Sequence, residues 1–246
     1  MKIEVYVLCL NEMDILPWAV GYWRLFADKV TVFDNGSTDG SLEYLSQFDW
    51  ITVKHYITNE GTNDVVMRTL KNNCWKGTDA DWIVVCDMDE MLFSPEGVRT
   101  TLAKAMEKNI DIIYPQWYTL VSDAVPAYDG QLLHRIRPMW TPKPNEAKPM
   151  IFQPTKFKEI NYCCGAHYCQ PVVNDEYFAS HNGAIYCLHT ERRLSPEYYI
   201  RKTKEAQARR SQINLKYGFG KQYEDSEEKM LAMLEQDKNN AVKLDL

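Results

Sequence analysis

The stretch DWIVVCDMDE (residues 81–90) joins a nearly continuous apolar run to three carboxylates, Asp87, Asp89 and Glu90. An apolar run without polar alternation is typical of a strand that is buried on both faces of a sheet. Acidic side chains usually lie on solvated surfaces, yet here they directly follow the most apolar part of their neighbourhood. The stretch therefore predicts a buried strand whose carboxyl end presents acidic side chains.

Strand and helix patterns alternate over the first half of the chain. We predict strands at residues 3–10, 29–35, 51–56, 81–87 and 111–120. Between them, apolar stripes at helical spacing predict a helix over about 14–26 and another that carries Val65, Val66, Thr69 and Leu70. A further helix is predicted over 94–108, with Ser94 as N-cap. This order favours an α/β fold, with a Rossmann-like, mostly parallel sheet flanked by helices.

Polar residues follow three of these strands at the point where each one ends. They are Asn11 and Glu12, Asp34 with Asn35, and the acidic group 87–90. Ligands of such sheets bind outside the carboxyl ends of the strands. In FDNGSTDGS (33–41), the glycines permit tight turns, and Asp34 is placed to meet a base or a ribose. The same residues would also be expected in a strand–turn–helix connection that binds no ligand.

The second half of the chain has a different character. Residues 121–190 are rich in proline and aromatic residues, and we expect a smaller mixed-sheet extension with a short strand at 132–140. A basic helix is predicted from Ser195 to about Tyr217, stopped by Gly218. We expect one domain over residues 1–220, with a nucleotide-sugar-binding half at 1–120 and an acceptor-side half with a closing helix at 121–220. Residues 221–246 then form a charged helix or tail.

The bulk properties exclude several classes of function. The chain has 246 residues and a net charge of −6, so no general attraction to nucleic acid is expected. No signal peptide and no transmembrane run is recognisable, although peripheral membrane contact stays open. The seven cysteines lie in apolar contexts that suit reduced thiols, which favours a cytoplasmic protein.

The acidic group suits a hard divalent cation. Mg²⁺ and Mn²⁺ prefer carboxylate oxygens and keep positions open for water and phosphate. Two aspartates at the end of a buried strand can face one point if the strand breaks there. A solvated acidic loop is the simpler explanation, and only the two neighbouring polar strand ends favour the metal.

Two segments carry a family resemblance. CLNEMDILPWAVGYWRLFADKVTVFDNGSTDGS (9–41) and ADWIVVCDMDEML (80–92) resemble the family 2-like glycosyltransferases with a GT-A fold, in particular the subgroup whose acidic motif reads D-x-D-E. A weaker similarity covers IYCLHTERRLSPEYYIRKTKE (185–205), whereas residues 94–184 match only loosely. The resemblance implies an inverting transfer of sugar from a nucleotide-sugar donor, such as a UDP- or GDP-sugar, to a hydroxyl of a glycan or another acceptor.

The resemblance also implies roles for individual residues. The donor nucleotide would contact Asn11, Glu12, Asp34, Arg68 and Asp87. Mn²⁺ or Mg²⁺ would bind Asp87, Asp89 and His189, and the diphosphate would meet Arg192, Arg193 or Lys202. The match at Arg192 and Arg193 is imperfect, because the segment reads HTERRLS where relatives keep an aromatic residue after the histidine.

Several carboxylates could act as the general base that deprotonates the acceptor hydroxyl, and the sequence does not choose among them. Our candidates are Glu90 and Asp129. The cluster CCGAHYC (163–169) holds Cys163, Cys164, His167 and Cys169, but it lacks the paired spacing of a structural zinc site. His167 is instead a candidate for the acceptor pocket, because relatives often have a histidine in this stretch.

Two other functions fit the same architecture. A sugar nucleotidyltransferase usually carries a Gly-rich, Arg- or Lys-bearing loop after the first strand, where this chain reads LNEMDIL (10–16). A non-catalytic nucleotide- or carbohydrate-binding protein is the second alternative.

Overall fold

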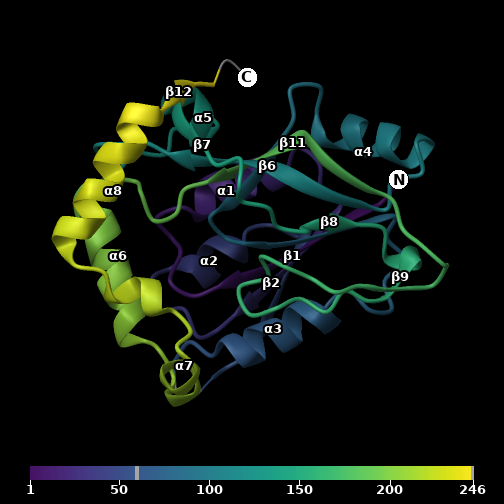
Figure 1. Cartoon of the computed structure of the whole chain (residues 1–246), viewed down its shortest axis with the longest axis horizontal. Coiled ribbons are helices and arrows are strands. Elements are labelled where there is room, and N and C mark those ends of the chain that lie inside the picture. The colour runs from purple at the N-terminus through teal and green to yellow at the C-terminus, as the bar shows by residue number, and fades with distance from the viewer. Residues whose placement is uncertain (59–60, 245–246) are drawn as a thin grey trace.

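The N-terminal strands pair in parallel, as their apolar patterns predict. The computed structural model describes residues 1–58 and 61–244 (Figure 1). β1 (Ile3–Cys9) lies between β2 (Lys29–Asp34) and β4 (Trp82–Asp87), and β3 (Ile51–His55) extends the sheet beyond β2. Every residue of β1 is buried, with alternate side chains in two apolar cores on opposite faces of the sheet. The run is apolar except for Glu4, because neither face meets solvent, and the Glu4 carboxylate accepts hydrogen bonds from Tyr6 and Thr78.

The sheet continues as a mixed extension. Its strand order is β12-β7-β6-β8-β4-β1-β2-β3, with β8 antiparallel to both β4 and β6, while β11 lies parallel to β6 and antiparallel to β5. A second sheet contains only β9 and β10. The remaining strands are β5 (Glu90–Phe93), β6 (Ile112–Leu120), β7 (Met139–Pro142), β8 (Ile151–Phe152), β9 (Phe157–Glu159), β10 (Val172–Val173), β11 (Ser180–His189) and β12 (Val242–Lys243). The predicted α/β class, with helices flanking a mostly parallel sheet, is confirmed.

Helices cover both faces and one end of the sheet. Figure 1 shows α6 and α8 packed side by side at that end. Among the described residues, no helix has both the length and the apolar character that crossing a bilayer requires. The helices are α1 (Leu16–Trp23), α2 (Ser41–Leu45), α3 (Asp64–Asn73), α4 (Val98–Glu107), α5 (Leu133–Ile136), α6 (Pro196–Ala208), α7 (Gln212–Tyr217) and α8 (Glu227–Asn240), with short 3₁₀ turns η1 (Pro154–Lys156) and η2 (Lys221–Glu224).

Three local predictions are wrong. Ser94 does not cap α4, because a turn closed by the Gly97 N–H on the Ser94 carbonyl comes first and makes Gly97 the N-cap. The expected strand at 132–140 is the helix α5 followed by β7. The basic helix after Ser195 is interrupted at residues 209–211, where the Arg209 carbonyl accepts from Thr62 N–H at 2.6 Å. A long-range backbone contact thus replaces the helical hydrogen bonds that local propensity favours.

The C-terminal helix is attached through a buried ion pair. Met230 and Leu234 of α8 pack on Tyr199 of α6. Asp237 is ion-paired with Arg193, whose side chain is 1% exposed, and with Lys143 at 2.8 Å. Breaking a buried pair by removing one partner leaves an uncompensated charge in a medium that solvates it poorly.

We therefore expect Asp237→Ala to lower the free energy of unfolding by about 3–5 kcal/mol, measured by urea denaturation. Lys229→Ala is the matched control on the same helix, because it removes an exposed i,i+4 pair with Asp225. Its effect should stay below about 0.5 kcal/mol. Equal losses in the two variants would show that the buried pair does not fasten α8.

Candidate functional site

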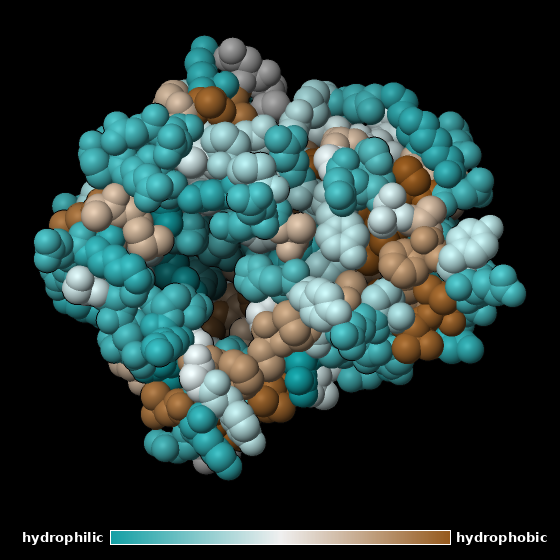
Figure 2. All heavy atoms as spheres, in the orientation of Figure 1, coloured by the Kyte–Doolittle hydropathy of each residue, from teal (hydrophilic) through white to brown (hydrophobic). Residues whose placement is uncertain are grey.

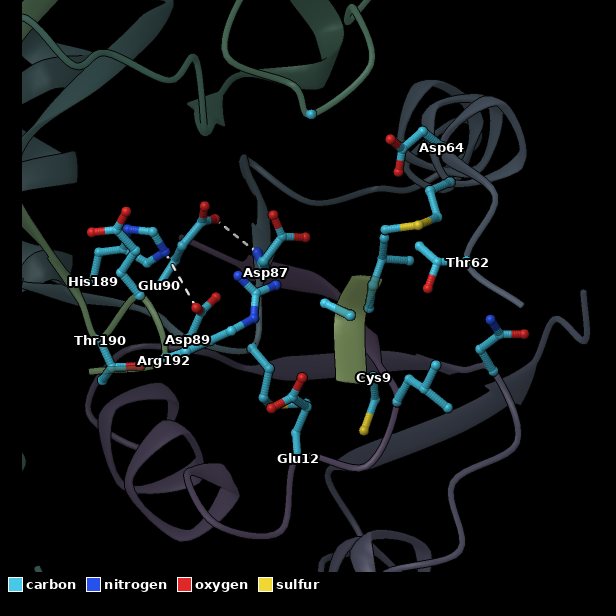
Figure 3. A pocket seen from close by; sticks show the side chains of 18 of the residues that line it. Cys9, Glu12, Thr62, Asp64, Asp87, Asp89, Glu90, His189, Thr190 and Arg192 are labelled. Carbon is cyan, nitrogen blue, oxygen red and sulfur yellow. Dashed lines mark hydrogen bonds and ion pairs between the residues drawn. The ribbon is translucent and has the colours of Figure 1, made fainter. Parts of the chain in front are cut away.

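A pocket of about 450 Å³ opens at the carboxyl edge of the parallel strands. Its walls come from the ends of β1, β4 and β11, from α3, and from the segment around η2. Figure 2 shows a hollow in the molecular face beside the C-terminal helices. In Figure 3, Asp89, Glu90, His189 and Arg192 lie on one side of the pocket, and Thr62 and Asp64 lie on the other. The strand ends therefore meet where the sequence pattern places them.

Two buried lysines hold the acidic turn between β4 and β5. Asp87 accepts hydrogen bonds from Lys71 at 2.6 Å and from Lys148 at 2.8 Å. Lys148 also donates to Glu90 at 2.5 Å, and Glu90 accepts from the Asp87 N–H at 2.8 Å. Burial alone would raise the pKa of Asp87, but the two ammonium groups outweigh it and hold that pKa well below its usual value. Asp87 is therefore ionised, and both Asp87 and Glu90 are ion-paired with Lys148.

Asp89, between these two carboxylates, faces a different partner. Its Oδ2 lies 3.2 Å from Nε2 of His189. Strands β5 and β11 create this contact, because their antiparallel register sets His189 opposite Glu90. Burial opposes both charges, yet the pairing lowers the pKa of Asp89 to about 2 and raises that of His189 to about 9. Nδ1 of His189 is buried and makes no hydrogen bond in the described part of the chain.

The Asp89–His189 pair fits a divalent cation that the resemblance implies. Adjacent ligand atoms of an octahedral ion lie about 3 Å apart when each metal bond is about 2.1 Å long. A carboxylate and an imidazole form a donor set that suits Mn²⁺. No three His, Cys, Asp or Glu side chains among the described residues converge into a complete metal cluster. The protein thus offers two ligand atoms, and substrate and water would have to supply the others.

Arginines line the pocket near this pair. Arg192 follows β11 in a left-handed conformation (φ 60°), and its guanidinium lies 5.0 Å from the ring of Tyr223 in η2. Arg68 and Arg209 also line the pocket, and Nε of Arg209 is buried without a hydrogen-bond partner among the described residues. Three arginines therefore line the pocket, and the charge of Arg192 acts on Asp89.

Arg193 and Lys202, predicted as diphosphate contacts, do not line the pocket. Arg193 points to Glu191 and to Asp237 of α8. Lys202 is buried and donates to the Asn11 carbonyl at 2.7 Å. Both cations hold the scaffold behind the pocket.

The residues predicted to bind the nucleotide divide into two groups. Glu12 and Arg68 line the pocket, and burial raises the pKa of Glu12 to about 7 against the opposing effect of Lys202. Asn11 and Asp34 instead shape the turn between β2 and α2. The Asn11 side chain accepts from Thr38 N–H at 2.7 Å. Asp34 is fully buried and accepts from the N–H groups of Gly36 and Ser37.

Two other predicted features lie apart from the metal pair. Asp129 is exposed outside the pocket, where it accepts hydrogen bonds from Gln131. Cys163, Cys164 and Cys169 are free thiols, and they do not converge with His167 as metal ligands within residues 1–58 and 61–244. Cys163 and His167 do line the pocket.

Several residues of the site have no clear signal in the sequence. Lys71, which lines the pocket, and Lys148, which pairs with the acidic turn, were not predicted, because an isolated lysine in a helix or before a strand is usually solvated. A signal exists for Lys71, since Asp64, Arg68 and Lys71 recur at spacings of four and three on one face of α3. Tyr56, Met67 and Arg209 carry no comparable signal.

Comparison with known proteins gives only weak similarities. No protein-family model matches the chain, and no curated protein does. One similar structure is assigned as a glucose-1-phosphate thymidylyltransferase from Bacillus anthracis in complex with a sucrose. It is 9% identical with a TM-score of 0.33, and the match covers 62% of this chain and 68% of that one. A 4-diphosphocytidyl-2C-methyl-D-erythritol synthase is 15% identical with a TM-score of 0.35, and the match covers 62% and 75% of the two chains. Similarities this weak do not indicate what the chain does.

We expect Lys148→Met to lower the free energy of unfolding at pH 7 by about 3–5 kcal/mol, because buried Glu90 loses the one cation that it pairs with among the described residues. Protonation of the unpaired carboxyl in acid removes the uncompensated charge, so the deficit should shrink as the pH falls. The double variant Lys148→Met/Glu90→Gln removes both charges and should recover most of the loss. A Lys148→Met protein as stable as the wild type would contradict this account.

Proposed function

We propose that the chain is a metal-dependent glycosyltransferase that moves a sugar from a nucleotide-diphosphate sugar to a hydroxyl acceptor. The observation that carries the proposal is the Asp89–His189 pair, 3.2 Å apart, in a pocket at the carboxyl edge of the sheet that three arginines also line. Two protein ligands with neighbouring cations suit a metal diphosphate. We propose residues 1–220 as the catalytic domain, closed by the C-terminal helix.

The nucleoside end of the donor fits the side of the pocket formed by β1, β3 and α3. Apolar atoms of Leu8, Tyr56 and Met67 line it, and Asn35 and Asp64 add polar groups. Such a slot can accept a base and a ribose. Asn11 and Asp34 support it from behind by fixing the turn after β2.

The diphosphate is proposed to lie between Asp89 and the arginines. Mn²⁺ or Mg²⁺ held by Asp89 and His189 would neutralise the negative charge that develops on the leaving diphosphate. Arg68, Arg192 and Arg209 would bind phosphate oxygens, and the stacking of Arg192 on Tyr223 limits its movement. Asp87 and Glu90 are committed to lysines, so we assign them to holding the turn rather than to the metal or the acceptor. Inversion follows from the family resemblance.

Nucleotidyl transfer, the reaction named for the Bacillus anthracis protein, is the alternative. Such an enzyme must bind the phosphates of a nucleoside triphosphate before any pyrophosphate is released. The loop after β1, LNEMDI (10–15), carries acidic residues and no basic ones, which disfavours a triphosphate there. The two reactions also release different products, a nucleoside diphosphate or pyrophosphate.

The test combines calorimetry of UDP and GDP binding with product analysis. We expect one of these nucleotides to bind with Mn²⁺, and affinity to fall by about 100-fold or more in EDTA, because metal–phosphate contacts contribute several kcal/mol. Nucleotide-sugar turnover should release the nucleoside diphosphate, whereas nucleoside triphosphate with sugar 1-phosphate should give no pyrophosphate.

Asp89→Ala and His189→Ala should each abolish the metal-dependent part of binding and turnover. Asp49→Ala, an exposed aspartate before β3, is the matched control and should behave like the wild type. Full metal-dependent activity in Asp89→Ala would rule out the proposed site. Pyrophosphate release would instead assign the chain to the nucleotidyltransferases.

A further inference from the structure

The turn at residues 163–168 presents a histidine to the pocket. Tyr162 and Cys169 pair as an antiparallel bridge, and the Cys163 N–H donates to the Tyr168 carbonyl at 2.9 Å. The turn between them contains Gly165 (φ 81°) and Ala166 (φ 59°). Ala166 is buried, so a non-glycine residue is held in the left-handed region immediately before His167. Backbone strain of this kind costs about 1–3 kcal/mol and is concentrated at functional sites.

The imidazole of His167 has a defined position. A Cβ built on Gly165 would approach Cδ2 of His167 to 3.0 Å, so the glycine backbone lies directly against the ring. Trp117 lies on another side, with ring centroids 6.5 Å apart, and Trp117 also packs on His189 at 5.0 Å. One indole ring therefore contacts both His167 and the proposed metal ligand His189.

The ring nitrogens of His167 are available for a substrate. The side chain is exposed within the pocket lining, and in the described chain it makes no hydrogen bond or ion pair. The charged groups that face it are Lys148, Glu90, Asp87 and His189. Partial desolvation of the ring inside the pocket, followed by the charge of Lys148, lowers the pKa of His167, so the imidazole is neutral near pH 7.

Other candidates for a general base are less suitable. Asp87 and Glu90 accept hydrogen bonds from Lys148, Asp89 faces His189, and Asp129 lies outside the pocket. Glu146 also lines the pocket as an exposed carboxylate, and its side chain makes no hydrogen bond or ion pair within residues 1–58 and 61–244. Burial raises the pKa of Glu12 to about 7, but that carboxylate lies 3.6 Å from the ammonium group of Lys202. A neutral imidazole whose nitrogens are unpaired in the described chain is the better proton acceptor at neutral pH.

We propose that His167 is the catalytic base of the transfer, an inference that rests on the proposed glycosyltransferase function. One ring nitrogen takes the proton of the acceptor hydroxyl while the oxygen bonds to the anomeric carbon. The bond from that carbon to the diphosphate oxygen breaks, and its electron pair leaves with the nucleoside diphosphate. The imidazolium then returns its proton to solvent. The acceptor consequently enters from the side of the pocket formed by residues 163–167.

The experiment uses the full chain with Mn²⁺ and either UDP-glucose or GDP-mannose, whichever nucleotide binds more tightly, and water serves as the acceptor. His167→Gln should lower the rate of nucleoside diphosphate release by about 10²–10⁴-fold, while the nucleotide Kd stays within about twofold. Added imidazole should restore part of the rate to His167→Ala, which a purely structural role would not allow. His181→Gln, an exposed histidine on β11, is the matched control and should keep the wild-type rate.

Gly165→Ala offers an independent variant, since its new methyl group would push the imidazole away without removing it. It should lower the rate while leaving nucleotide affinity unchanged, with folding checked by thermal melting. A His167→Gln protein that keeps more than half of the rate overturns the proposal. Loss of rate in Glu146→Gln alone would overturn it as well and assign the base to that carboxylate. A wild-type chain that neither binds the nucleotide nor releases it overturns the proposed function itself.

Discussion

The pocket depends on the ion pairs that the ammonium group of Lys148 makes with Asp87 and Glu90. The Lys148 side chain is 1% exposed and lies within hydrogen-bonding distance of both Asp87 and Glu90. Without it, two carboxylates within a four-residue turn would repel each other in a poorly solvated place, and the turn would not close. The bridge allows β4 to run directly into β5, and β5 in turn aligns β11. His189 reaches Asp89 only because this chain of contacts is complete.

The lysines neutralise only two of the three carboxylates in the acidic motif. Lys71 and Lys148 pair with Asp87 and Glu90, so these four side chains carry no net charge together. Asp89 is left with an imidazole, which can give up its proton, whereas a buried lysine in a tight ion pair holds its proton strongly. The three carboxylates of DMDE therefore serve different purposes although they are adjacent in sequence. Two stabilise the turn, and the third faces the pocket.

The fold was predictable because its signals are local. Continuous apolar runs mark the buried parallel strands, and the alternation of strands and helices orders them. The polar strand ends and His189 were also recognisable from the sequence, although Asp34 and Asn11 turned out to stabilise a turn behind the pocket. Lys148, Lys71 and Arg209 were not predictable, since each acquires its role from a partner far away in the sequence. The break between α6 and α7 was missed for the same reason, because it depends on a contact with Thr62.

Residues with a strained backbone are found at the same pocket as the paired carboxylates and the arginines. Non-glycine residues with positive φ are uncommon, and three of them occur in segments that line this pocket: Ala166, Glu191 and Arg192. Each costs of order 1–3 kcal/mol and can persist only where the surrounding contacts enforce it. A fold under selection for stability alone would place glycine at these positions, as it does at Gly36 and Gly40. The strained residues instead orient Arg192 and His167 toward one cavity, which is the arrangement expected when the position of a side chain matters more than the energy of its backbone.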